Sequence, residues 1–288
     1  MLPARFEYHR PGSLDEALGL LGSLEDAKIL AGGQSLIPVM KLRFSAPANL
    51  IDLNRVPGLD SIEDTDGTLA IGALARHNQI AGSETVSARN TLLASTAPQI
   101  ADPLVRNLGT VGGSLAHGDP AGDWGSAMIA AGARVVLRRT DGEREVPASE
   151  LFVDLFTTTI EPDEVLTEVR VPVPTGPSGG AYLKLERKIG DFATVGVAVQ
   201  VDMSNGTIGR AGIALTGVGS TNIHAAEAEA SLAGAEPNED AFAQAGRLAA
   251  AAANPVTDVR GSADYKRHVV EVYVRRGLAR AVETARAS

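Results

Sequence analysis

Two short glycine-containing segments of this 288-residue sequence have the residue types that bind a phosphate or diphosphate. The first glycine segment is Ala31-Gly32-Gly33-Gln34-Ser35 and the second is Thr110-Val111-Gly112-Gly113-Ser114. Glycine lets backbone N–H groups approach an anion closely, and a neighbouring hydroxyl adds another donor. A single Gly-Gly pair is more often an ordinary tight turn. Because two such segments occur in one chain, the sequence predicts that they clamp one diphosphate.

Further polar residues follow the second glycine segment, in a stretch from 109 to 123 that we expect to be a long loop. Asp119 and Asp123 can hydrogen-bond ribose hydroxyls or flavin ring groups. Asp123 is equally suited to capping a buried helix expected at residues 124 to 131. His117 is a candidate ligand contact, because it lies on the same stretch.

Several kinds of chemistry are excluded by what the sequence lacks. It has no Cys, which rules out a Cys nucleophile and Cys-ligated iron–sulfur clusters in this chain. Neither G-x-G-x-x-G followed by an acidic residue nor G-x-x-x-x-G-K-[ST] is present, so Rossmann and P-loop sites are not supported. Ser35 and Ser114 lie outside G-x-S-x-G, and the five His are not paired with carboxylates. We therefore predict no catalytic residue and no metal site.

Composition limits the class of partner and the location. Hydrophobic residues make up 44% of the chain, enough for two or three packed units. The 26 Lys and Arg against 35 Asp and Glu give a net charge of −9, which disfavours binding to nucleic acid or an anionic membrane. No segment has the length of a signal peptide core or a membrane span, so we expect a cytoplasmic protein.

The pattern of elements predicts an α+β protein with a boundary near the Pro- and Gly-rich stretch at 172 to 180. Before it we expect a helix at 13 to 22, a strand at 28 to 30 and a helix at 36 to 42. Further strands are expected at 49 to 53, 69 to 73, 134 to 139, 144 to 147 and 165 to 171. After the boundary we expect three antiparallel strands, at 181 to 188, 193 to 203 and 207 to 216, and helices at 222 to 233, 238 to 253 and 263 to 286. The predicted domains are 1–175, with subdomains of about 1–54 and 55–175, and 180–288.

Three stretches of the sequence resemble the FAD-binding medium subunits of molybdenum hydroxylases of the xanthine dehydrogenase family. They are AGGQSLIPVMKLR (31 to 43), TVGGSLAHGDPAGD (110 to 123) and KLERKIGDFATVGVAV (184 to 199). The resemblance is nearest to the aerobic carbon monoxide dehydrogenase type. It covers essentially the whole chain, from FEYHRPGSLDEAL to RRGLARAVE.

The resemblance implies a two-part FAD-binding domain of the vanillyl-alcohol-oxidase (PCMH) type and a smaller C-terminal domain. By motif match, both glycine segments would hold the FAD diphosphate, and His117 and Asp123 would contact the cofactor farther along. Leu166 and Lys184 are implied as additional contacts. Two positions depart from the type, with Gln34 where His is frequent and Phe192 where Tyr is common.

The resemblance also implies a division of labour among subunits. A large subunit would hold the molybdenum cofactor and oxidise the substrate, and a small subunit would carry [2Fe–2S] clusters. This chain's FAD would take their electrons and pass them to an external acceptor such as a quinone, in a dimer of heterotrimers. The resemblance also allows a location at the inner face of the membrane through the partners. Carbon monoxide is the expected substrate, and an N-heterocycle, nicotine or aldehyde is the alternative. An alternative of another class is an FAD-free scaffold or assembly module, which the intact glycine pairs argue against.

Overall fold

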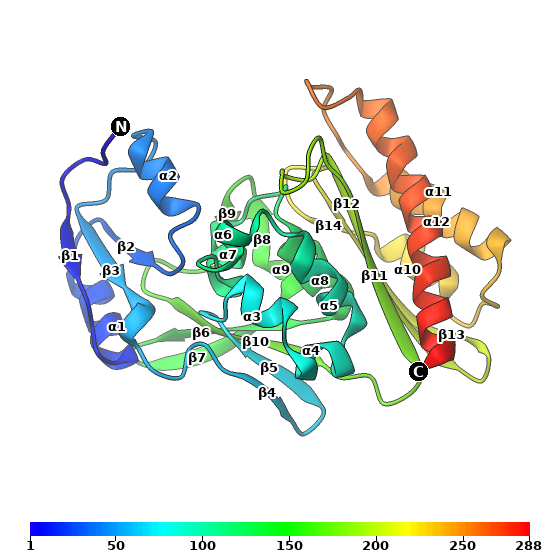
Figure 1. The fold of residues 1–288 in the computed structure, drawn as a ribbon, viewed down its shortest axis with the longest axis horizontal. Coiled ribbons are helices and arrows are strands. Elements are labelled where there is room, and N and C mark those ends of the chain that lie inside the picture. The colour runs from blue at the N-terminus through cyan, green and yellow to red at the C-terminus, as the bar shows by residue number, and fades with distance from the viewer.

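The computed structural model describes all residues, 1–288, and arranges them around three main sheets (Figure 1). A three-stranded parallel sheet near the N-terminus is followed by a five-stranded antiparallel sheet and then by a four-stranded antiparallel sheet. Figure 1 shows these units side by side, with the blue N-terminal unit at one end and the red C-terminal helix at the other. The mixture of strands and helices agrees with the expected α+β character.

The N-terminal unit consists of a parallel sheet and two helices. Its strands are β1 (Glu7–His9), β3 (Asn49–Asp52) and β2 (Ala27–Leu30), in that spatial order, and its helices are α1 (Leu14–Ser23) and α2 (Leu36–Lys41). Ser13 caps α1, because its hydroxyl accepts a hydrogen bond of 3.2 Å from the backbone N–H of Glu16. The first glycine segment connects β2 to α2, which confirms the predicted order of strand, glycine turn and helix.

The middle unit has the strand order β4-β5-β10-β6-β7, with a small two-stranded sheet of β8 and β9 beside it. The strands are β4 (Ile62–Thr65), β5 (Thr68–Gly72), β6 (Arg134–Arg139), β7 (Gly142–Pro147), β8 (Phe152–Asp154), β9 (Thr157–Thr158) and β10 (Val165–Pro172). The α-helices are α3 (His77–Ala81), α4 (Glu84–Arg89), α5 (Thr91–Thr96), α6 (Pro103–Arg106), α7 (Val111–His117), α8 (Asp123–Ala131) and α9 (Ala148–Leu151). The 3-10 helix η2 (Ala97–Gln99) completes it, whereas η1 (Leu53–Arg55) follows β3 and packs with the N-terminal unit.

The buried helix α8 joins the middle unit to the C-terminal sheet. Every residue of α8 is buried, as the apolar run from Trp124 to Ala131 predicts. The hydrophobic core that contains the α8 side chains also includes Tyr182, Ala198 and Ala214, which lie on strands of the C-terminal sheet. The middle and C-terminal units therefore share one hydrophobic core.

The C-terminal unit has four strands, not the three that the sequence predicts. They are β11 (Ser178–Leu185), β12 (Val195–Ser204), β13 (Thr207–Thr216) and β14 (Ile223–His224). Its helices are α10 (Ala226–Leu232), α11 (Glu239–Ala252) and α12 (Ala263–Ala287). The two residues of β14 pair with the end of β13. So short a strand has no alternating pattern, and the prediction wrongly placed it inside a helix.

The connection between β10 and β11 is short, because β10 ends at Pro172 and β11 begins at Ser178. The predicted domain limits of 175 and 180 fall on and just after this connection, and they stay a prediction. None of the helices combines the length and the apolar character that crossing a membrane requires.

Candidate functional site

The two glycine segments meet in the folded chain. A Cβ atom built on Gly32 would overlap the carbonyl oxygen of Leu108 and would lie 2.8 Å from the Cα of Gly109. A Cβ on Gly113 would lie 3.4 Å from the Cβ of Ala31. The segments therefore form one surface, and the missing side chain of Gly32 is what allows the backbones to approach so closely.

The first glycine segment offers a row of unused hydrogen-bond donors. No backbone N–H group of residues 31 to 35 donates a hydrogen bond within the chain, and neither does the Ser35 hydroxyl. Gly33 has a φ of +72°, a left-handed conformation that favours glycine. Consecutive free N–H groups of this kind bind anions. The donors present here fit the diphosphate of a dinucleotide.

The second glycine segment is the start of a helix, so the predicted loop at 109 to 123 is wrong for residues 111 to 117. Thr110 caps α7, since its Oγ1 accepts a hydrogen bond of 3.1 Å from the backbone N–H of Gly113. Val111 and Leu115 are buried on one side of this helix. The cap and this burial outweigh the low helix propensity of the glycine pair.

The glycines of the second segment are explained by close packing of the backbone, and less by a need for free N–H donors. The backbone N–H groups of Val111 and Gly112 donate to the carbonyl oxygens of Ala75 and Ala73, at 3.1 and 2.9 Å. A Cβ on Gly112 would overlap Ala73. The hydroxyl of Ser114, however, makes no hydrogen bond within the chain. The two segments thus have different local roles despite their similar sequences.

His117 lies at the end of α7 opposite Thr110. Its ring is half-buried, with a ring-centroid distance of 5.1 Å to Phe156 in the turn between β8 and β9. Burial lowers the pKa of His117, and the carboxylate of Asp119 opposes this effect. The ring therefore favours its neutral form and can donate or accept one hydrogen bond.

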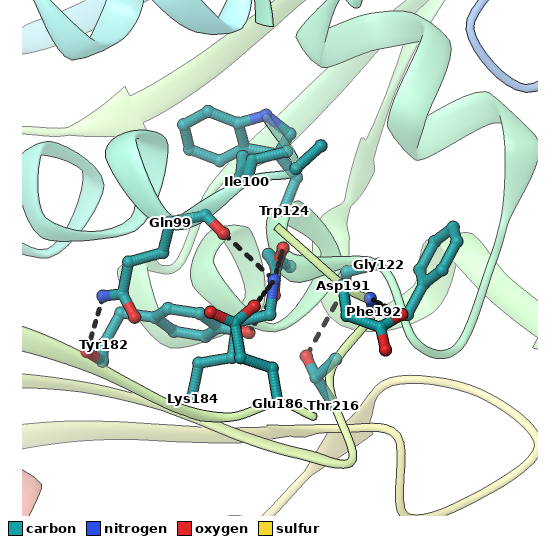
Figure 2. A network of polar contacts seen from close by, with 12 residues as sticks. Gln99, Ile100, Gly122, Trp124, Tyr182, Lys184, Glu186, Asp191, Phe192 and Thr216 are labelled. Atoms are coloured by element: carbon teal, nitrogen blue, oxygen red, sulfur yellow. Dashed lines mark hydrogen bonds and ion pairs between the residues drawn. The ribbon is translucent and has the colours of Figure 1, made fainter. Parts of the chain in front are cut away.

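Asp123 lies at the boundary of the middle and C-terminal units, in a buried polar network with Tyr182 and Lys184, which Figure 2 labels. Its Oδ1 accepts a hydrogen bond of 2.6 Å from the Tyr182 hydroxyl, and its Oδ2 accepts one of 2.9 Å from Lys184 Nζ. The N-cap of α8 is Gly122, so the alternative in which Asp123 caps this helix is wrong. Burial raises the pKa of Asp123, whereas Lys184 and Tyr182 lower it.

Lys184 connects this network to a second carboxylate. Its Nζ also donates to the carbonyl oxygen of Gln99 at 3.0 Å and lies 3.6 Å from Glu186 Oε2. That oxygen of Glu186 is buried and has no hydrogen-bond partner (Figure 2). Two carboxylates therefore share one buried ammonium group, and one carboxylate oxygen is left free for a donor from a ligand.

Leu166, the remaining candidate, has a buried side chain. It lies on β10 opposite Leu137 of β6, next to an irregularity in the pairing at Glu168. Its side chain belongs to the core of the middle unit. The structure therefore places the Leu166 side chain in the core, away from solvent.

Sequence reasoning missed two groups of residues at this site. Tyr182 and Glu186 flank Lys184 at two-residue spacing on and just after β11, a pattern that places alternate side chains on one face. That alternation was a usable signal. His77 and Trp124 are the second group, and nothing local in the sequence connects them.

His77 contacts Gly109, the residue that precedes the second glycine segment. The Trp124 indole N–H donates a hydrogen bond of 3.0 Å to His77 Nδ1, and both side chains are buried. A Cβ on Gly109 would lie 2.6 Å from His77 Nε2. Burial lowers the pKa of His77 from 6.5 to about 4, with the charges of Arg106 and Arg76 adding to the effect.

This low pKa predicts a loss of stability in acid. Between pH 6.5 and about 4 the unfolded chain binds a proton at His77 that the folded chain does not, so stability falls as the pH falls. Across that window the loss is about 3 kcal/mol.

Urea unfolding at several pH values measures this loss of stability. His77→Gln keeps an acceptor for Trp124 and should flatten the slope, whereas His268→Gln, at an exposed position of α12, should not. Equal slopes in the His77 variant and the wild type would contradict the assignment.

Comparison with known proteins places the chain in a family. Residues 4–174 match the family model described as the FAD binding domain in molybdopterin dehydrogenase, and residues 180–281 match the CO dehydrogenase flavoprotein C-terminal domain. The chain belongs to this family of molybdopterin dehydrogenase flavoproteins. Its N-terminal region is accordingly an FAD-binding domain, which agrees with the free donors of the first glycine segment.

Individual relatives of this flavoprotein cover nearly its full length. It is 45% identical over 279 residues to the carbon monoxide dehydrogenase medium chain of Hydrogenophaga pseudoflava, covering 96% of this chain and 97% of the relative. It is 42% identical to the 6-hydroxypseudooxynicotine dehydrogenase complex subunit alpha of Paenarthrobacter nicotinovorans, covering 99% and 97%. A solved structure of the Hydrogenophaga pseudoflava carbon monoxide dehydrogenase superposes with a TM-score of 0.96 at 47% identity, covering 99% of each chain.

Proposed function

We propose that this chain is the FAD-carrying medium subunit of a molybdenum hydroxylase. It takes electrons from [2Fe–2S] clusters of a small partner subunit and passes them to an external acceptor such as a quinone. The observation that carries this proposal is the row of free N–H donors at residues 31 to 35, held against the second glycine segment. Bound FAD supplies the electron-accepting chemistry.

The chain's own residues have binding and orienting roles in this proposal. The first glycine segment and the Ser35 and Ser114 hydroxyls would hold the diphosphate. His117, Asp123 and Leu166 would contact the cofactor farther along, in a binding unit of the vanillyl-alcohol-oxidase (PCMH) type spanning residues 1–175. Lys184 would contact it from β11 of the C-terminal unit. Tyr182 orients the Asp123 carboxylate through a hydrogen bond of 2.6 Å, and this carboxylate accepts a hydrogen bond of 2.9 Å from the Lys184 ammonium.

The relatives, which are subunits of multi-subunit dehydrogenases, support large and small partner subunits. A large subunit would hold the molybdenum cofactor and the substrate, in a dimer of heterotrimers. Carbon monoxide is the proposed substrate, because the relative at 45% identity and the superposed structure are carbon monoxide dehydrogenases. The relative at 42% identity, a 6-hydroxypseudooxynicotine dehydrogenase subunit, supports an organic substrate as the second candidate.

FAD binding is the first measurement. We expect the purified chain, or its co-expressed complex, to hold one FAD per chain, shown by the absorbance spectrum and by chromatography of the released cofactor. Absence of FAD from both the chain and the complex would contradict the proposal and favour the FAD-free scaffold. The second measurement adds carbon monoxide or 6-hydroxypseudooxynicotine to the complex without oxygen. The substrate that bleaches the flavin absorbance identifies the reaction.

A further inference from the structure

Arg76 and Asn54 connect the two glycine segments through their side chains. Asn54 Nδ2 donates a hydrogen bond of 2.8 Å to the carbonyl oxygen of Ala31, in the first segment. The guanidinium of Arg76 donates to Asn54 Oδ1 and to the carbonyl oxygen of Leu108, which lies against Gly32. The first glycine segment and the backbone at Leu108 and Gly109 meet at a contact that we call the junction. The Arg76 guanidinium donates to Leu108 on one side of it and, through Asn54, is connected to Ala31 on the other.

The backbone of Arg76 is itself attached to the second side of this junction. Arg76 pairs with Thr110 in an isolated antiparallel bridge, and the neighbouring His77 N–H donates to the Gly109 carbonyl oxygen at 3.0 Å. The Arg76 N–H donates to Gln79 Oε1 at 2.7 Å, at the start of α3. The main chain of Arg76 thus belongs to the side of the second segment, and its side chain extends from there to Asn54.

Asn54 is held in place independently. Asp52 accepts hydrogen bonds from the backbone N–H of Asn54 at 2.8 Å and from its Nδ2 at 2.5 Å. The hydroxyl of Tyr8 donates to the other oxygen of Asp52. These contacts orient the Asn54 amide, with its oxygen toward Arg76 and its nitrogen toward Ala31.

The charge of Arg76 is not neutralised by a close partner. No carboxylate lies within ion-pair distance, and both of its acceptors are neutral oxygens. Burial lowers the pKa of Arg76, and the carboxylates of Asp60 and Asp52 act on it only through their charge. A half-buried guanidinium without a counter-ion, beside five free N–H groups, favours an anion at the junction.

We propose that Arg76 and Asn54 form a clamp that sets the separation of the two glycine segments and thereby positions the donors for a diphosphate. Both are positioning residues, because they act through the backbone of Ala31 and Leu108. The inference rests on the proposed function, since it takes FAD as the diphosphate-containing ligand. It adds two residues from outside the glycine segments to the binding site.

Three single variants and one control test the clamp by fluorescence titration of the full chain, or of the co-expressed complex, with FAD. Arg76→Gln and Arg76→Lys should each bind FAD about tenfold or more weakly. A lysine keeps the charge, but all its donors are on one nitrogen, whereas Arg76 reaches Leu108 through Nη1 and Asn54 through Nη2. Asn54→Ala should weaken binding to a similar extent. Arg89→Gln is the matched control, since Arg89 pairs with Asp64 on another part of the same unit.

The double variant Arg76→Gln/Asn54→Ala distinguishes a clamp from two unrelated structural roles. The two losses should not add, because either change breaks the same connection. Circular dichroism and thermal melting of the cofactor-free variants confirm that each is folded. Additive losses, or wild-type affinity in Arg76→Lys, would overturn the clamp while leaving the proposed function intact. A wild-type protein that binds no FAD, alone or in the complex, would overturn both.

Discussion

Replacing Gly32 by alanine is expected to weaken FAD binding roughly a hundredfold, since overpacking at a rigid contact costs on the order of 1–3 kcal/mol or more. The added Cβ would overlap the Leu108 carbonyl oxygen and lie 2.8 Å from the Gly109 Cα. Both neighbours are backbone atoms, so neither can move aside as a flexible side chain would. The two glycine segments would have to separate, and the row of donors would no longer face the same ligand.

Fluorescence titration of the cofactor-free protein with FAD measures this effect. Gly22→Ala is the matched control, because it makes the same chemical change in α1, where a Cβ meets nothing within 4 Å. It should bind FAD as the wild type does. Affinity within a fewfold of wild type in Gly32→Ala would show that the contact between the segments is not required for binding.

Replacing Lys184 by methionine is expected to destabilise the folded chain by about 3–5 kcal/mol, the usual cost of removing one partner from a buried ion pair. The buried carboxylate of Asp123 would lose its cation, and Glu186 would lose the nearest positive charge. Because this network lies between α8 and β11, the loss would weaken the attachment of the C-terminal sheet to the middle unit.

Urea unfolding at neutral pH measures the loss, with Lys188→Met as the control, because Lys188 is exposed and forms no ion pair. Adding Asp123→Asn to Lys184→Met should restore part of the stability by removing the unpaired charge.

The stability of the Lys184→Met variant should also depend on pH in a defined direction. Without Lys184 the pKa of Asp123 rises further, so the variant approaches wild-type stability as the pH falls and loses it as the pH rises. A loss below about 1 kcal/mol would contradict the role given to this pair.

Features set by neighbouring residues could be predicted from the sequence. The cap of α1 by Ser13 depends on residues within one helical turn, and the strand, glycine turn and helix around residues 31 to 35 form a local pattern. The hairpin between β12 and β13 depends on Asn205 and Gly206, which both adopt positive φ. In each case the interactions that decide the conformation lie close together along the chain.

Where local preference and packing disagreed, the prediction was wrong. Glycine propensity indicated a loop after residue 109, but the Thr110 cap and the burial of Val111 and Leu115 make it α7. The strand β14 is too short to show a pattern, and it exists because β13 offers it hydrogen bonds. These elements are determined by partners distant in sequence.

By itself the sequence determined the family, the two glycine segments and the types of residue proposed to face a diphosphate. Only the tertiary structure decided which groups meet: Gly32 against Leu108, Asp123 with Tyr182 and Lys184, and Arg76 across the junction to Asn54. Such pairings depend on how separate elements pack around a shared core, and periodicity along one element carries no information about which other element it will face.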